Sequence, residues 1–135
     1  MAQSVPIGTR AEVEVIVEHK HTLAAYNELL PPVFSTPHMI ALMEHACFVA
    51  QQPFCDAGEI TVGSAIHVEH RAPATIGQKI IANATLEAID GRFYIYRVTA
   101  RNGQQQIGSG TVHRAVVHVE SFLKKFNPAP QKSGV

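Results

Sequence analysis

Glu44 is the first residue of this sequence whose type and surroundings suggest chemistry. It lies between Met43 and His45 in an apolar run, where a carboxylate costs free energy unless it is paired or hydrogen-bonded. Perturbed carboxylates cluster at functional sites, but a carboxylate that reaches solvent or forms an interface salt bridge is an equally good interpretation. Glu44 is therefore a candidate general base or nucleophile.

His70 is the second candidate. It ends an alternating segment in which one face is predicted to carry Val62, Ser64, Ile66, Val68 and His70 itself. Its ring is therefore expected to point toward the core or a cleft wall. Imidazole is the side chain best suited to acid/base work near neutral pH, yet a single histidine on an apolar face is more often a satisfied core residue. Residue type alone leaves both interpretations open.

Thr36 is the third candidate, because it stands at the head of a predicted helix. We expect Thr36 to be the N-cap, with Pro37 at the first helical position. A capping hydroxyl is already engaged, which favours a structural role. The first turn of a helix also presents oriented N–H groups that stabilise negative charge, such as that on a carbonyl oxygen under attack. Ser35, beside Thr36, is a candidate for the same part.

Arg114 and Gly63 are two further unusual positions on the predicted strands. Arg114 lies in an apolar alternation, between Val112 and Val116, where an arginine is either paired at an interface or binds a phosphate. Gly63 indicates a bulge or a close approach of the backbone to another group.

The histidines do not predict a metal centre. His19 and His21 lack a third ligand at a convincing spacing, and so do His67 and His70, which fall on opposite faces of a strand. We expect no metal and no other cofactor.

One long helix and five strands must position these residues. The helix is predicted from Thr36 to just before Pro53, apolar on nearly all sides and therefore almost wholly buried. Asp90-Gly91 and Asn102-Gly103 predict hairpins with type I′ turns, which need positive φ at both central residues. The predicted strands cover residues 10–18, 60–72, 78–89, 92–101 and 104–119. A long sheet packs against a single apolar helix by curling around it.

Length and composition predict one domain over residues 1–135, with a disordered tail at 127–135. The chain is 46% hydrophobic and only 16% charged, which favours a homo-oligomer. The 11 basic and 11 acidic residues are scattered, so neither a nucleic-acid partner nor a membrane surface is expected. Two cysteines and no leader-like start favour the cytoplasm, and no apolar run is long enough to span a membrane.

Three blocks of the sequence, in order, resemble hotdog-fold thioesterases of the fluoroacetyl-CoA thioesterase-like family. The similarity runs from Val5 to Phe126. The blocks are residues 33–47 (VFSTPHMIALMEHAC), 62–70 (VGSAIHVEH) and 107–116 (IGSGTVHRAV). The resemblance implies an α+β hotdog fold, in which a long central helix is wrapped by a five-stranded antiparallel sheet.

The resemblance also implies a site and a reaction. The family's reactive threonine, glutamate and histidine fall on Thr36, Glu44 and His70. Its glycine and arginine, which are associated with the acyl and CoA parts of the ligand, fall on Gly63 and Arg114. The implied reaction converts an acyl-CoA and water to a carboxylate and CoA, at the interface of a homodimer. Such dimers could pair into tetramers.

The segment before the helix, residues 26–32, departs from the family. We expect it to line the acyl pocket, but it lacks the aromatic lid residues of the fluoroacetyl-specific enzyme, so selectivity for a fluorinated acyl group is not implied. Two other functions remain open: hydration or dehydration of enoyl or 3-hydroxyacyl thioesters, and acyl-CoA binding by a dimer without catalysis. The order of a helical glutamate followed by a histidine on a later strand favours hydrolysis.

Overall fold

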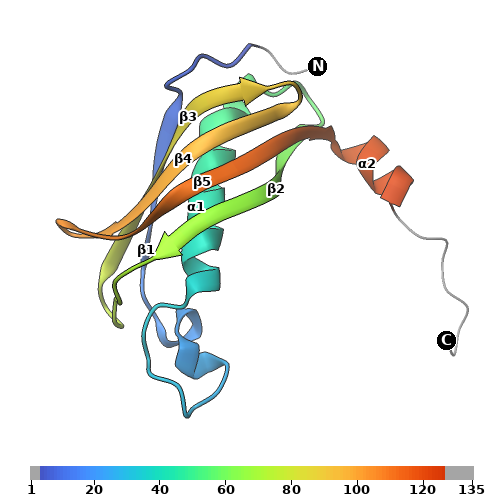
Figure 1. Ribbon diagram of the computed structural model, residues 1–135. Helices are drawn as coiled ribbons and strands as arrows, with labels where there is room; N and C mark the ends of the chain where they lie inside the picture. The colour runs from blue at the N-terminus through green and yellow to red at the C-terminus, as the bar shows by residue number, and fades with distance from the viewer. Residues whose placement is uncertain (1–3, 127–135) are drawn as a thin grey trace, which may run out of the picture.

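A curled, five-stranded antiparallel sheet wraps around one long helix in the computed structural model, which describes residues 4–126 (Figure 1). The strand order is β1-β3-β4-β5-β2, so β1 and β2 are the two edges. The expected fold class is confirmed. The tail expected to be disordered, residues 127–135, lies outside the described residues. The main elements are β1 (Arg10–Ile16), α1 (Thr36–Gln51), β2 (Glu59–His70), β3 (Lys79–Asp90), β4 (Phe93–Asn102) and β5 (Gln105–His118).

Shorter elements complete the chain. Two 3-10 turns, η1 (His19–His21) and η2 (Leu23–Ala25), precede α1, and a third, η3 (Gln52–Phe54), follows it. A short helix, α2 (Val119–Phe126), continues from the end of β5 and projects from the body of the molecule (Figure 1). Across residues 4–126, none of the helices has the length and apolar character to cross a membrane.

The N-cap of α1 is Ser35, and the prediction of Thr36 as the cap is wrong by one residue. Ser35 has extended backbone angles, and its side chain accepts a hydrogen bond from the N–H of His38. Thr36 is the first helical residue and Pro37 the second. A capping side chain accepts from an N–H group two or three residues on, and Ser35 does so at His38. The Thr36 hydroxyl is therefore released for another contact.

Only one side of α1 is buried in the single chain. Its buried apolar residues are Met39, Met43, Ala46, Cys47 and Ala50. The opposite side is open: Ala41 and His45 are exposed, and Val49 keeps 38% of its surface accessible. The expectation of a helix buried on nearly all sides is therefore wrong for one chain, because a single curled sheet covers only the side it faces.

A bulge in β2 changes which of its side chains face α1. Gly63 pairs with Arg114 and Ala65 with His113, so Ser64 is an extra residue in the strand. One extra residue reverses the alternation of side chains. Thr61 and Gly63 therefore share the helix side with His70, and the predicted placement of Val62 and Ser64 on that side is wrong.

The two predicted hairpins form, but with a different turn. Asp90 pairs with Phe93 and Asn102 with Gln105, so Gly91 and Gly103 occupy the first loop position. Their φ angles are 61° and 62°, and among residues 4–126 only glycines have positive φ. A glycine with positive φ at the first central position is the pattern of a type II′ turn. The expected type I′ turns are therefore wrong.

Candidate active site

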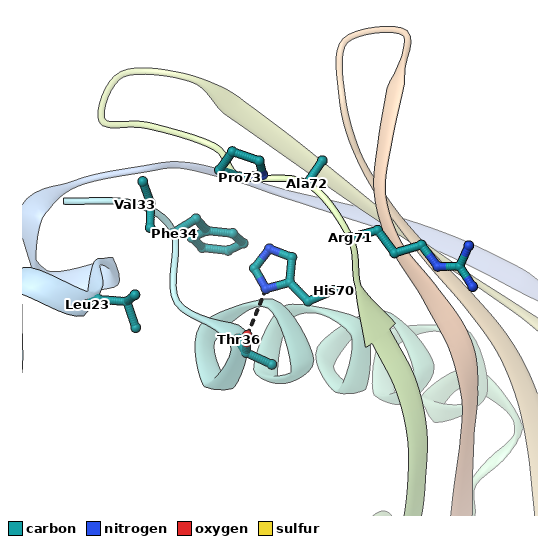
Figure 2. Close-up of a pocket in the computed structure, with 8 residues that line it drawn as sticks. All are labelled: Leu23, Val33, Phe34, Thr36, His70, Arg71, Ala72 and Pro73. Atoms are coloured by element: carbon teal, nitrogen blue, oxygen red, sulfur yellow. Dashed lines mark hydrogen bonds between the residues drawn. The ribbon is translucent and has the colours of Figure 1, made fainter. Parts of the chain in front are cut away.

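Thr36 and His70 meet at the junction of α1 and β2. The Thr36 Oγ1 atom lies 2.8 Å from His70 Nδ1, and the dashed line in Figure 2 marks this hydrogen bond. Thr36 is the first residue of α1, and His70 is the last residue of β2. The end of the edge strand therefore delivers an imidazole to the electropositive start of the helix.

The second nitrogen of His70 faces a cavity and has no partner. His70 Nε2 is buried and makes no hydrogen bond to any residue in the described range. A buried polar atom without a partner is unusual and is often explained by a ligand or a catalytic role. The adjoining cavity has a volume of about 280 Å³ and is lined by Leu23, Val33, Phe34, Thr36, His70, Arg71, Ala72 and Pro73 (Figure 2).

The start of α1 also offers one backbone donor. The His38 N–H is taken by the Ser35 hydroxyl, and Pro37 has no N–H. The N–H of Thr36 has no hydrogen-bond partner within residues 4–126. It is one of the amide groups that a helix leaves unsatisfied at its start, and it can stabilise a developing negative charge.

Glu44 forms an ion pair with Arg114 from β5. Arg114 Nη1 donates to Glu44 Oε2 at 3.0 Å. Thr61 holds the rest of the guanidinium: Arg114 Nε donates to its hydroxyl at 3.2 Å, and Nη2 donates to its carbonyl oxygen at 2.7 Å. The Arg114 side chain is 7% exposed and the Glu44 side chain 33% exposed, so the carboxylate is the accessible member of the pair. Arg114 fixes the direction in which that carboxylate points.

Gly63 allows Glu44 to lie against β2. A Cβ atom at position 63 would overlap Glu44 Oε2. The sequence predicted a close approach at this glycine, and the approaching group is the carboxylate. Whether Gly63 and Arg114 also contact the acyl or CoA part of a ligand stays a prediction.

The two pairs are separated along α1. Thr36 and Glu44 are eight residues apart, which at the helical rise corresponds to about 12 Å. One chain therefore brings Thr36 to His70, and Glu44 to Arg114 and Gly63, but it does not bring Glu44 to the imidazole.

The candidate Ser35 is engaged by a neighbouring side chain, and Cys47 lies in the core. Ser35 is fully buried, and its Oγ lies 2.7 Å from His38 Nδ1. Cys47 is also buried, and burial raises the pKa of its thiol to about 12, despite the opposing effect of nearby Arg114. A thiol with that pKa supplies almost no thiolate at neutral pH. Cys47 is therefore not a nucleophile in this fold.

Sequence reasoning missed several residues of the site. Thr61 holds Arg114, but the bulge hid the face on which Thr61 lies. Leu23, Val33 and Phe34 line the cavity, whereas no residue of the segment 26–32 does. Within that segment Leu29 is 89% exposed. The role of segment 26–32 as a wall of the acyl pocket therefore stays a prediction. Phe34, the aromatic residue that does line this cavity, was visible in the sequence only as one apolar residue among many.

The curled five-stranded sheet around one central helix is the hotdog fold of the thioesterase superfamily. A solved structure of a Thermus thermophilus hypothetical protein, a thioesterase superfamily member, superimposes with a TM-score of 0.84 at 28% identity, covering 92% of each chain.

Closer relatives narrow the class to one family. Residues 17–120 match the family described as fluoroacetyl-CoA-specific thioesterase. The fluoroacetyl-CoA thioesterase of Streptantibioticus cattleyicolor is 37% identical over 131 residues, covering 93% of this chain and 94% of the relative. The solved structure of the fluoroacetyl-CoA thioesterase FlK has a TM-score of 0.86 at 34% identity, covering 95% and 100% of the two chains. The chain therefore belongs to the fluoroacetyl-CoA-specific thioesterase family.

Proposed function

We propose that this protein hydrolyses the thioester of a small acyl-CoA, giving a carboxylate and CoA. The observation that carries the proposal is the His70 imidazole, bonded to Thr36 on one side and unpartnered on the side that faces the cavity. Family membership supports the reaction class. The reaction as proposed requires no metal or separate cofactor, since CoA is part of the substrate.

The active site in this proposal is completed by a second copy of the chain. Glu44 is about 12 Å along α1 from Thr36, too far to act on a carbonyl held there. In a twofold dimer, contacts are reciprocal, so two antiparallel α1 helices that cross near Ile40 would place each Glu44 opposite the partner's Thr36. The open side of α1, which exposes Ala41 and Val49, is the surface available for such a contact.

The thioester carbonyl would lie at the start of α1. The unpaired N–H of Thr36 and the positive end of the helix would stabilise the oxyanion. His70 would donate a proton to the departing sulfur as the carbon–sulfur bond breaks. Thr36 would orient the attacking group and hold the tautomer of His70 through its 2.8 Å contact with Nδ1.

Glu44 has two possible roles, and the proposal includes both. As a general base it would take a proton from water, whose oxygen attacks the thioester carbon. As a nucleophile it would attack that carbon itself, release CoA and form an anhydride that water then cleaves. Repeated turnover in heavy-oxygen water separates the two, because only the anhydride route leaves the label in the Glu44 carboxylate.

The acyl group is proposed to be short. The cavity beside Thr36 and His70 holds about 280 Å³, at the lower end of ordinary ligand pockets. Fluoroacetyl-CoA is the substrate named for the relatives. The segment 26–32 supplies no wall of this cavity and no phenylalanine, so we do not propose selectivity for fluorine. A cytoplasmic location completes the proposal, supported by the free thiols of Cys47 and Cys55.

A thiol-release assay with short, branched, aromatic and long-chain acyl-CoAs tests the reaction. We expect release of CoA from the short esters. A change in enoyl absorbance without thiol release would instead indicate hydration, and binding of a CoA ester without turnover would indicate a binding protein.

Mixing two inactive variants tests the shared site. Glu44→Gln and His70→Ala are co-expressed at equal levels with different affinity tags. If each site combines residues of two chains, half of the dimers are mixed and one of their two sites is intact, giving about a quarter of the wild-type activity. No recovery in purified mixed dimers would place the whole site within one chain and overturn this part of the proposal.

A further inference from the structure

Phe34 lines two cavities. On one side lies the cavity of about 280 Å³ that contains Thr36 and His70. On the other side, between β1 and α1, lies a second cavity of about 220 Å³, lined by Val15, His21, Phe34, His38, Ala41, Leu42 and His45. Within residues 4–126, Phe34 is the one residue that lines both. Its side chain is almost fully buried, which is consistent with a ring that stands as a wall between them.

The backbone around Phe34 is held on both sides, which fixes the position of this wall. The Phe34 N–H donates to the Ala74 carbonyl at 2.8 Å, and Phe34 also forms a β-bridge with Thr22. The next N–H, that of Ser35, donates to the His21 carbonyl at 2.9 Å. Figure 2 shows the ring of Phe34 beside that of His70, facing the space above the start of α1.

The second cavity has the character of a hydrocarbon site. Its walls are mainly apolar, from Val15, Ala41 and Leu42, and no carboxylate lines it. His21 accepts a hydrogen bond from the Glu18 N–H at its Nδ1 atom, which requires a ring nitrogen without a proton. Burial, and the neighbouring His38, lower the pKa of His21, which favours the neutral ring. A neutral imidazole adds little cost to the binding of an alkyl chain.

We infer that Phe34 sets the length of the acyl group that the site accepts, because its ring closes the first cavity and keeps the acyl chain out of the second. This inference rests on the proposed function, in which the thioester carbonyl lies at Thr36 and His70. The substrate class is then a short acyl-CoA. A medium-chain acyl group would fit only if the ring of Phe34 were absent and the two cavities were joined.

Phe34→Ala tests the inference directly. The measured quantity is the ratio of kcat/KM for octanoyl-CoA to kcat/KM for propionyl-CoA. We expect this ratio to rise at least about tenfold over wild type, since even one methylene in an apolar pocket changes the specificity ratio by that order. Because the loss of a buried ring could prevent folding, Phe34→Leu is measured in parallel, with a smaller rise in the same ratio expected.

Refilling the second cavity provides the matched control. Leu42→Phe places a larger side chain of α1 in the second cavity and so fills part of it. Leu42 does not line the first cavity. By itself it should leave propionyl-CoA hydrolysis unchanged. Combined with Phe34→Leu or Phe34→Ala, it should return the octanoyl-to-propionyl ratio toward the wild-type value. A ratio that stays high in the double variant would show that the chain does not enter this cavity and would overturn the inference.

A binding measurement separates failure of this inference from failure of the proposed function. Non-hydrolysable thioether analogues of propionyl-CoA and octanoyl-CoA are titrated into wild type, Phe34→Leu and Phe34→Ala by calorimetry. The measured quantity is the ratio of the affinity for the octanoyl analogue to that for the propionyl analogue. If this ratio rises at least about tenfold in the variants over wild type while no thioester is hydrolysed, the proposed reaction is wrong and the role of Phe34 stands. An unchanged ratio of affinities in a folded variant overturns the role of Phe34, whatever the activity.

Discussion

The Thr36–His70 pair and the Glu44–Arg114 pair differ in how firmly the protein holds them. Thr36 and His70 share one hydrogen bond beside an open cavity, and the second nitrogen of His70 has no partner among the described residues. Arg114 makes three hydrogen bonds, one to Glu44 and two to Thr61, and is nearly fully buried. The first pair keeps unused hydrogen-bonding capacity for a ligand, whereas the second uses its capacity to fix a carboxylate.

This difference is consistent with two roles in one reaction. A group that donates a proton to a leaving atom must have a free site for it, as His70 Nε2 has. A carboxylate that acts as base or nucleophile must instead be held in one direction, which Arg114 and Thr61 achieve for Glu44. The variants below are ordered from the largest expected effect on turnover to the smallest, and the first four of them test this division.

Removal of the His70 imidazole or the Glu44 carboxylate should have the largest effect on turnover. His70→Ala and Glu44→Gln are each expected to lower kcat by roughly 10²–10⁴-fold, the usual contribution of a general acid or base. Steady-state thiol release measures the loss. Circular dichroism and size-exclusion chromatography should show folded proteins with the wild-type oligomeric state. Wild-type turnover in either variant would remove that residue from the mechanism.

Gly63→Ala should disturb the Glu44 pair alone. The added methyl group would overlap Glu44 Oε2 and force the carboxylate away from its position. Since the end of a glutamate side chain can move, we expect a folded protein whose kcat falls on the order of 100-fold, as small misplacements of reacting groups can cause. Ser64→Ala, at the adjacent bulge position, is the matched control and should retain activity. Equal kcat values for Gly63→Ala and wild type would mean that the carboxylate position does not matter.

Arg114→Lys should lower kcat less than Gly63→Ala does. It also distinguishes an arginine that positions Glu44 from one that binds the CoA ester. Lysine keeps the charge but lacks the planar fork, so contacts with Thr61 are lost. We expect kcat to fall about tenfold with little change in KM for the CoA ester, and unfolding in urea to show a loss of about 1–3 kcal/mol. A raised KM with unchanged kcat would support the phosphate-binding role that an arginine in an apolar alternation suggested in the sequence.

Cys47→Ala should have no effect on turnover at neutral pH, because the wild-type thiol is protonated. The substitution is expected to change how the free energy of unfolding depends on pH in the alkaline range. The folded-state pKa is about 12 and the ordinary value of the thiol is 9.0, so the stability that the neutral thiol contributes is complete below pH 9 and is lost as the pH rises toward 12. Between pH 7.5 and 9.5, wild type should lose about 1 kcal/mol more than Cys47→Ala in urea unfolding. Identical losses would contradict the shifted pKa.

Much of the fold was predictable because it depends on local patterns. The alternation of the strands, the three-and-four spacing of α1 and the glycines of the two hairpins all act over a few residues. The predictions failed where a shift by one residue changes the structure. Ser35, and not Thr36, caps α1, and Ser64 is an extra residue that reverses the alternation of β2. Glycines at the first loop position likewise changed the turn type, although both hairpins form as expected.

The sequence by itself determined the elements of this protein, their order and the kinds of reactive group that they carry, because periodicity and residue chemistry are local properties. Tertiary structure alone decided which of these groups meet. Thr36 and His70 are 34 residues apart, and Glu44 and Arg114 are 70 apart. Contacts over such separations depend on sheet register, and the single bulge at Ser64 sets which β2 side chains face the helix. The same long-range packing placed Phe34 between two cavities, which no local pattern could indicate.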